Sequence, residues 1–373
     1  MKAICKKTNL IKALGIVSRA VSTVSTLGII KGILIKTDGD LNINLSATDI
    51  QISITTRMGA IVNEGGSVVV EARVFSDLIR KLPEEDVVLA TDERNVLTIT
   101  TETTDNKIQG IEESEFPRIE GMEEGKKIII EREALKDMIE GTCFAASADE
   151  SRGVITGALF EVEAGDLAMV ALDGYRVAIR RDFREALRGE SLKAVIPARM
   201  MREAGKILAE SCKEEVCLEV GQNKAVLVTE DTTVRMNLLA GEYIKYREVL
   251  PKEYAVRFVC RREEILNAVE LAEVYKSDGK NSFVRFSIGE GSLVVSSRAD
   301  VGHGKETVAI EKEGEDLEIG FDARFLKEAL RAAGDEKVVM EFGTSISPCV
   351  VRPVEGEGFT YLILPVRLST VNV

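Results

Sequence analysis

The sequence has few of the side chains that enzymes use most often for acid–base and nucleophilic chemistry. Its 373 residues include one histidine, His303, which lies between Gly302 and Gly304. Mechanisms that pair histidine with serine, with cysteine or with a second histidine therefore lack a component. The sequence also has no GxxxxGKS/T phosphate loop, no HExxH zinc motif and no GxGxxG motif after a strand. We therefore predict that the protein is not an enzyme and that it holds neither a cofactor nor a metal ion.

Cysteine pairs and long apolar runs are also missing. The six cysteines are dispersed along the chain: Cys5, Cys143, Cys212, Cys217, Cys260 and Cys349. None forms a CxxC pair, so neither a zinc ribbon nor a disulfide framework is indicated. No stretch reaches the roughly 18 apolar residues of a membrane span, and lysines are scattered through the first apolar segment, unlike in a signal peptide. These features predict a cytoplasmic protein with no membrane partner.

Acidic residues are absent from the first 37 positions, although the whole chain has a net charge of −13. The net charge alone argues against a nucleic-acid-binding protein, because phosphates are neutralised by clustered lysine and arginine. The segregation of positive charge weakens that argument. A solvated helix face explains the same pattern, and charge alone leaves both interpretations open. The cations of this segment are Lys2, Lys6, Lys7, Lys12, Arg19, Lys31 and Lys36.

A turn-then-strand pattern occurs three times. Gly39-Asp40-Leu41 recurs as Gly165-Asp166-Leu167 and as Gly291-Ser292-Leu293, at steps of 126 residues. A repeat of this length, three times over, fills the chain. The sequence therefore predicts an N-terminal, a central and a C-terminal module over residues 1–125, 126–253 and 254–373.

Within a module the apolar spacing predicts the order helix, strands, helix, strands. In the first module Leu10 and Leu14 share one helical face, whereas Leu41, Ile43 and Leu45 alternate with polar residues as in a half-buried antiparallel strand. Each module is expected to pack two helices on one face of an antiparallel sheet, which gives an α+β fold.

An arginine recurs at the start of the second helix of each module. Arg73, Arg199 and Arg324 follow alanine at equivalent positions of the repeat. They either anchor the helix to the sheet or direct positive charge at phosphate groups, and the repeat alone does not decide between these roles.

Four short motifs, together with the triple repeat, resemble the bacterial beta sliding clamp family, the processivity subunit of the replicative DNA polymerase III holoenzyme. The resemblance spans residues 1–368. Two motifs lie at the module joints, one follows a strand of the central module, and one is close to the end of the chain. They are Glu115-Phe116-Pro117, Arg247-Glu248-Val249-Leu250-Pro251, Asp173-Gly174-Tyr175-Arg176 and Leu364-Pro365-Val366-Arg367-Leu368.

The resemblance implies the DNA clamp fold and a head-to-tail homodimer that closes as a ring around double-stranded DNA, without sequence preference. Its implied partners are the alpha subunit of the replicative polymerase, the clamp loader, and other DNA polymerases and repair proteins that carry clamp-binding peptides. The alternative is a repeat-built peptide-binding scaffold that does not encircle DNA, for which we expect a monomer. A metal-dependent hydrolase is a third hypothesis, and no group of residues supports it.

The resemblance also assigns residues to three surfaces. The peptide-binding pocket, between the second and third modules, is assigned Ile155, Leu172, Gly174, Tyr175, Arg176, Val177, Ile244, Val249, Ile346, Pro348, Leu362, Ile363, Leu364, Pro365, Val366, Arg367 and Leu368. The DNA-facing candidates are Lys12, Arg19, Arg73, Arg152 and Arg199, although Gly153 and Val154 replace an aromatic pair of the family. The dimer interface is assigned Ile108, Ile111, Val274 and Tyr275, with Asn106 where the family often has an aromatic residue.

Overall fold

The computed structural model contains two compact units. The first unit comprises residues 1–133 and 203–238, and the second comprises residues 134–202 and 239–373. The structure describes the whole chain except residues 23–27, 123, 276–281, 300–301 and 368–373. Leu368, which the sequence assigns to the peptide pocket, therefore lies outside the described residues.

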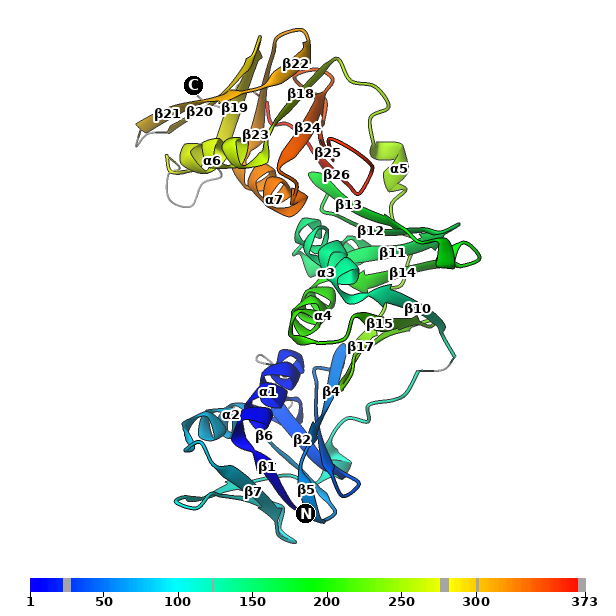
Figure 1. The fold of residues 1–373 in the computed structure, drawn as a ribbon, viewed down its shortest axis with the longest axis vertical. Coiled ribbons are helices and arrows are strands. Elements are labelled where there is room, and N and C mark those ends of the chain that lie inside the picture. The colour runs from blue at the N-terminus through cyan, green and yellow to red at the C-terminus, as the bar shows by residue number, and fades with distance from the viewer. Residues whose placement is uncertain (23–27, 123, 276–281, 300–301, 368–373) are drawn as a thin grey trace. The chain divides into compact units, whose positions relative to one another are not determined.

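The order of elements repeats three times along the chain (Figure 1), and we call the repeats copies 1, 2 and 3. Copy 1 has β1 (Lys2–Lys6), α1 (Lys7–Val17), β2 (Gly32–Asp38), β3 (Asn42–Thr48), β4 (Ile52–Gly59), β5 (Ile61–Glu64), β6 (Ser67–Glu71), α2 (Ala72–Lys81), β7 (Asp86–Thr91), β8 (Val96–Thr100) and β9 (Asp105–Gln109). Copy 2 has β10 (Lys126–Glu131), α3 (Arg132–Glu140), β11 (Gly157–Glu163), β12 (Asp166–Leu172), β13 (Arg176–Phe183), β14 (Ser191–Pro197), α4 (Ala198–Glu210), β15 (Glu215–Val220), β16 (Lys224–Val228) and β17 (Thr232–Asn237). The short helix α5 (Tyr246–Val249) precedes copy 3, which has β18 (Val256–Arg261), α6 (Arg262–Glu273), β19 (Phe283–Gly289), β20 (Ser292–Ala299), β21 (Gly302–Ala309), β22 (Glu311–Gly314), β23 (Leu317–Asp322), α7 (Ala323–Ala333), β24 (Lys337–Phe342), β25 (Cys349–Pro353) and β26 (Phe359–Ile363).

Each copy begins with a strand, so the predicted order, with a helix first, is wrong by one element. In copy 1 this strand is β1, in which Ala3 and Cys5 are buried. It continues into α1 without a turn, because Lys6 has extended φ/ψ values and already caps the helix. A five-residue strand without a glycine or proline at its end gives no boundary signal, and the helical periodicity that follows conceals it.

In the described part of the chain, the strands form four antiparallel sheets. The first unit holds a five-stranded sheet in the order β5-β1-β7-β8-β9 and an eight-stranded sheet in the order β10-β15-β16-β17-β4-β3-β2-β6. The second unit holds a nine-stranded sheet in the order β14-β11-β12-β13-β26-β25-β24-β18-β22 and a four-stranded sheet in the order β21-β20-β19-β23. The strands of each copy are thus divided between two sheets, whereas the sequence predicted one sheet per module.

Two of these sheets run from one copy into the next. In the first unit, β4 of copy 1 pairs with β17 of copy 2, and we call this pairing the first joint. In the second unit, β13 of copy 2 pairs with β26 of copy 3, and we call this pairing the second joint. Backbone hydrogen bonds therefore connect consecutive copies, so each joint is a continuous sheet.

The apolar faces of the helices and strands form the core. Leu10 and Leu14 of α1 are buried as predicted, and so are Ile43 and Leu45 of β3. Leu41 is 71% exposed, because it lies in the turn before β3. Among the described residues, no helix is long and apolar enough to cross a membrane.

A cation at the first position of each copy's first helix binds the end of its second helix. Lys7 Nζ donates to the Leu82 carbonyl (2.6 Å), and Arg132 Nη1 donates to the Leu208 carbonyl (3.2 Å). Arg262 Nη1 donates to the Leu330 carbonyl of α7 (3.5 Å), and its Nε donates to the Asp335 carbonyl just after this helix (2.8 Å). Since the last carbonyls of a helix lack partners within it, these bonds satisfy them and complement the helix dipole.

Candidate functional site

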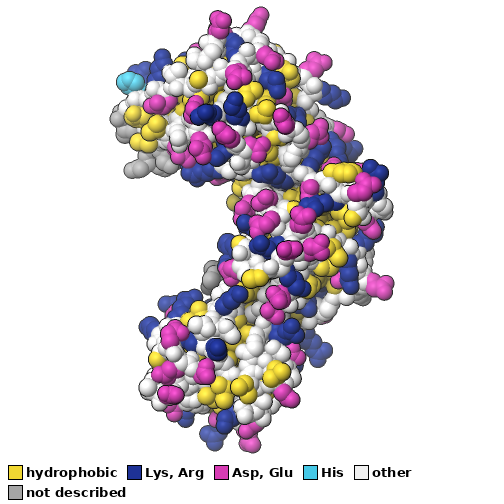
Figure 2. Space-filling model, in the orientation of Figure 1, with side chains coloured by type: hydrophobic (Ala, Val, Ile, Leu, Met, Phe, Trp, Pro, Cys, Tyr) yellow, Lys and Arg dark blue, Asp and Glu magenta, His cyan; other side chains and the backbone are white. Residues whose placement is uncertain are grey.

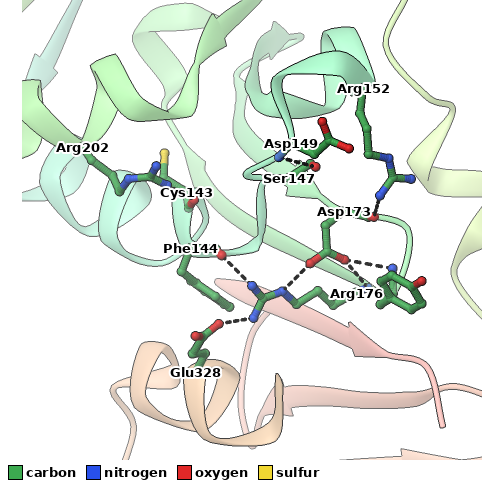
Figure 3. A network of polar contacts seen from close by, with 10 residues as sticks. Cys143, Phe144, Ser147, Asp149, Arg152, Asp173, Arg176, Arg202 and Glu328 are labelled. Carbon is green, nitrogen blue, oxygen red and sulfur yellow. Dashed lines mark hydrogen bonds and ion pairs between the residues drawn. The ribbon is translucent and has the colours of Figure 1, made fainter. Parts of the chain in front are cut away.

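The turn between β12 and β13 lies at the second joint and is stabilised by one carboxylate. Asp173 Oδ1 accepts hydrogen bonds from the backbone N–H groups of Tyr175 (2.9 Å) and Arg176 (3.1 Å) (Figure 3). Gly174 has φ = 91°, a conformation that side chains with a Cβ atom rarely adopt. The Asp-Gly pair of the sequence motif therefore fixes this turn and aims the two following side chains.

Arg176 is a bridge between copies 2 and 3. Its Nε donates to Asp173 Oδ2 (3.0 Å), its Nη2 donates to the Phe144 carbonyl (2.8 Å), and its Nη1 binds Glu328 of α7 (Figure 3). The guanidinium also lies over the rings of Phe144 and Phe325, at 5.3 and 4.7 Å. With its side chain 9% exposed, Arg176 positions the turn against α7.

A buried apolar floor lies beside this turn. Strand alternation places Val177 and Leu362, which are opposite each other in the β13–β26 pairing, on one face of the sheet. Arg176 and Ile363 are the next opposed pair and project to the other face. The floor therefore combines five of the residues that the sequence assigned to the pocket: Ile155, Leu172, Val177, Leu362 and Leu364.

Several other residues that the sequence assigned to the pocket have exposed apolar side chains. Tyr175 stacks on Phe325 of copy 3, with ring centroids 6.0 Å apart. Ile244, Val249 and Ile346 are exposed, and Ile346 is the most exposed of them at 79%. Exposed apolar side chains of this kind are more frequent on surfaces that bind another molecule than on other surfaces.

The end of the described chain closes one side of this region. The backbone N–H of Leu364 donates to the Tyr175 carbonyl (2.9 Å), and that of Val366 donates to the Gly320 carbonyl (2.8 Å). Pro365 is held between these two bonds. The structure thus brings the predicted C-terminal pocket residues next to the predicted turn, although the two segments are far apart in sequence.

Sequence reasoning missed Glu161, which binds α5 in the segment between β17 and β18. Its buried carboxylate accepts hydrogen bonds from Tyr246 Oη (2.9 Å) and Lys193 Nζ (2.7 Å) and pairs with Arg247 Nη2 (2.9 Å). Burial acts to raise the pKa of Glu161, but these donors outweigh it and the pKa lies below its ordinary value. The available signal was a glutamate between the apolar residues Phe160 and Val162, in a strand whose only other charged residue is Glu163 at its end.

Exposed cations recur on the second helix of each copy. Arg73, Arg199 and Arg324 occupy the second position of α2, α4 and α7, as predicted. A second cation follows seven residues later, on the same side of each helix. Sequence reasoning missed this second set, whose signal is the spacing of seven: Arg80, Lys206 and Arg331.

The other DNA-facing candidates lie in different surroundings. Lys12 is exposed on α1, whereas Arg19 is half-buried and donates to Glu210 (2.7 Å). Arg152 Nη1 donates to the Asp173 carbonyl (2.5 Å), so this side chain lies on the turn of the second joint (Figure 3). Basic and acidic side chains are interspersed over the face shown in Figure 2. The cations of the second helices are therefore recognised by their repeated positions, since they do not form a single basic patch on this face.

Two of the four candidate interface residues are associated with strands that end their sheets in the described part of the chain: Ile108 with β9 and Tyr275 with β21. In the first unit, Ile108 is buried in β9, and Ile111 is exposed beside Val69, to which its backbone is hydrogen-bonded. In the second unit, Val274 is 72% exposed. The ring of Tyr275 lies against β21. A Cβ atom on Gly304 would be 2.3 Å from this ring, so the contact requires glycine at this position.

Three family models match the chain, one for each domain of the DNA polymerase III beta subunit. The N-terminal, central and C-terminal domains match residues 1–120, 129–245 and 247–367. The beta sliding clamp of Halalkalibacterium halodurans is 31% identical over 364 residues, which are 94% of this chain and 95% of that protein.

Solved structures agree with these matches. The DNA polymerase sliding clamp of Bacillus subtilis is 27% identical with a TM-score of 0.94, and the match covers 98% of this chain and 99% of that chain. The sliding clamp of Bartonella birtlesii bound to griselimycin is 25% identical with a TM-score of 0.93, and the coverage is the same.

These comparisons confirm the resemblance drawn from the sequence motifs and the α+β fold of three domains. They also confirm that the chain is a sliding clamp and not an enzyme, because relatives that match it over nearly its whole length are beta sliding clamps. The chain belongs to the DNA polymerase III beta-subunit family, the beta sliding clamps.

Proposed function

We propose that two copies of the chain close head to tail into a ring around double-stranded DNA and tether the replicative polymerase to its template. The pairing rule of the two joints carries this proposal. In each joint the third strand after a copy's first helix pairs with the last strand of the next copy: β4 with β17, and β13 with β26. The next pairing in this series joins β21 to β9, and β9 must then come from a second chain.

Both strands are available for this pairing. Among the described residues, β9 ends its five-stranded sheet and β21 ends its four-stranded sheet. An unpaired edge strand presents N–H and C=O groups that favour pairing with another chain. Two identical seams would close two chains of three copies into a ring.

The second joint also indicates the register of the seam. There Ile363 lies opposite Arg176, and the matching positions of β9 and β21 are Ile108 and Gly302. We therefore expect Ile108 of one chain opposite Gly302 of the other. Tyr275 packs against β21 on the side of its two glycines, where it supports the edge.

The cations of the second helices suit a sliding contact with DNA. We assign the DNA-facing surface to the two exposed cations on each of α2, α4 and α7, together with Lys12 and Arg19. Contacts to phosphates alone give no sequence preference. A topological link needs little affinity, so a modest number of cations suffices in a chain with a net charge of −13.

The apolar floor and the exposed apolar side chains of the second joint suit short peptides that carry leucine or aromatic side chains. We propose that this pocket binds the alpha subunit of the replicative polymerase, the clamp loader, and other DNA polymerases and repair proteins. The binding of griselimycin to the Bartonella birtlesii clamp supports a ligand site on this fold. We further propose module boundaries near residues 125 and 253 and a cytoplasmic location.

Sedimentation equilibrium tests the ring. We expect the native protein to have twice the chain mass of 40.8 kDa. Val274→Asp introduces a charge at the proposed seam and should shift the protein toward the monomer, whereas Leu41→Asp, at a turn with nearly equal exposure, should not. A native monomer, or equal dissociation of both variants, would contradict the head-to-tail seam.

A further inference from the structure

The first joint has the same backbone geometry as the second. The Asp49 carboxylate accepts hydrogen bonds from the N–H groups of Gln51 (3.0 Å) and Ile52 (2.8 Å), as Asp173 does for the two residues that follow Gly174. Ile50 has φ = 78°, close to the value of Gly174. The N–H of Asn237 donates to the Gln51 carbonyl (3.0 Å), as that of Leu364 does to the Tyr175 carbonyl. The turn and the strand end are therefore repeated, residue for residue.

The side chains at the equivalent positions are polar at the first joint. Thr48 and Ser53 are opposed in the β3–β4 pairing, where Leu172 and Val177 are opposed at the second joint. Ser53 is opposite Arg235, as Val177 is opposite Leu362. A buried leucine of the apolar floor thus corresponds to an arginine.

These polar residues line a cavity of about 300 Å³ on the first unit. Its walls include Arg118 and Glu120 from the segment between β9 and β10. Lys224 of β16 and two residues of β17, Arg235 and Asn237, complete the polar lining. Lys224 pairs with Glu120 (3.1 Å), so the remaining charge of the cavity is positive. This contrasts with the acidic balance of the whole chain.

Arg235 is a cation that projects from the sheet into the lining of the cavity. It is half-buried, and among the residues that the structure describes it has neither an ion-pair nor a hydrogen-bond partner. Desolvation lowers the pKa of Arg235, and no neighbouring carboxylate counteracts it. A partly desolvated guanidinium gains most from a carboxylate, which it can bind through two parallel hydrogen bonds.

We propose that the cavity of the first joint is a second peptide site, which binds an acidic segment of a partner protein through Arg235. The exposed side chain of Ile50 adjoins the cavity and supplies an apolar contact, so an aliphatic residue beside the acidic one fits best. The comparison with the second joint rests on the peptide pocket proposed there, whereas the cavity and its charges do not depend on it.

Fluorescence anisotropy tests this site with a labelled octapeptide that alternates aspartate with leucine, and with the matched peptide that has asparagine in place of aspartate. Loss of one charge-assisted contact corresponds to about tenfold in affinity, so Arg235→Gln should weaken binding of the acidic peptide by about that factor. Arg235→Lys should retain most of the affinity. Arg94→Gln, which removes an exposed cation elsewhere on the first unit, should leave it unchanged.

The same titrations separate the two joints. Deletion of residues 364–373 should abolish binding of a leucine-rich peptide without acidic residues and leave the acidic peptide unaffected. If the deletion abolishes binding of the acidic peptide and Arg235→Gln does not, the acidic peptide binds at the second joint and the first joint holds no peptide site. Equal affinity of the aspartate and asparagine peptides would also overturn the proposal. A short DNA duplex provides a further test. If the duplex displaces the acidic peptide and its own binding is lost in Arg235→Gln, the cavity binds phosphate and the proposal is wrong.

Discussion

The two joints pair the same strands in the same register, yet their side chains differ in chemistry. At the first joint, Thr56 and Thr232 share a buried hydrogen bond (2.8 Å), and Arg57 pairs with Asp231 (3.5 Å) with both side chains about half exposed. At the second joint, a buried arginine network and an apolar floor connect the copies. The same backbone pairing is therefore combined with different side-chain contacts at the two joints.

The two joints show how side chains can differ on a shared backbone. Main-chain hydrogen bonds hold both joints, so the side chains on one face of each sheet are free to diverge. At the second joint they are apolar and create a floor. At the first joint the equivalent positions carry threonine, serine and arginine. A few side-chain differences on a shared backbone therefore distinguish the two binding sites that we propose.

The largest expected effect is that of Arg176→Ala at the second joint. Removing one partner of a buried ion pair leaves Glu328 and Asp173 without their cation, which costs about 3–5 kcal/mol of stability. Arg57→Ala removes the exposed ion pair of the first joint and should cost about 0–1 kcal/mol. Urea unfolding of both variants measures this difference. Equal losses would break the contrast between the joints.

The equivalent residues Leu362 and Arg235 give the next largest contrast. Leu362→Ala leaves a cavity in the apolar floor and should cost about 2–5 kcal/mol. Arg235→Ala, at the matching position of β17, should change the free energy of unfolding by no more than about 0.5 kcal/mol, because its guanidinium has no partner among the described residues to lose. Denaturant titration at constant pH is the measurement, and a larger loss for Arg235→Ala would show that this arginine is structural.

Glu161 gives the second joint a pH dependence. The donors around Glu161 hold its pKa below the ordinary value of 4.5. A carboxylate with a lowered pKa stabilises the fold above its unfolded pKa, and this contribution is lost as the pH falls through the folded value. Glu161→Gln should therefore cost about 1–3 kcal/mol at pH 7.

The melting temperatures of the native protein and of Glu161→Gln, measured from pH 7 to pH 3, test this account. The gap between them should be constant above pH 5 and narrow below pH 4.5. A gap that does not change with pH would mean that the carboxylate acts by packing and not by charge.

The smallest effect is expected at the first joint. Thr56→Val alone leaves the Thr232 hydroxyl buried without its partner and should cost about 1 kcal/mol. The double variant with Thr232→Val removes both hydroxyls and should return close to the native stability. A double-mutant cycle in urea measures the coupling, and a fully additive double variant would show that the two hydroxyls do not interact.

Patterns within one copy were predictable from the sequence. The turns at Gly39, Gly165 and Gly291 revealed the repeat, and the motif Asp173-Gly174-Tyr175-Arg176 located the turn of the second joint. The pairing of strands from different copies was not predictable, since β4 and β17 are far apart in sequence and periodicity within a strand does not identify its neighbour.

The chemistry of individual residues was predicted less well. Arg176 was assigned to the pocket, but its contacts with Asp173, Glu328 and Phe144 depend on three separate elements that only the folded chain brings together. Glu161 was missed for the same reason. Leu41 was predicted as a strand residue because the alternation continues one position into the turn.

The most direct test of the clamp is a loading experiment on nicked circular DNA. The cognate clamp loader and ATP place the protein on the circle, a high-salt wash follows, and a restriction enzyme then cuts the DNA. A closed ring should survive the wash, because phosphate contacts alone weaken steeply with salt, and it should be released when the DNA is cut. Protein that the loader places on the DNA but that the wash removes, or protein that stays bound after the cut, would contradict a ring that encircles DNA.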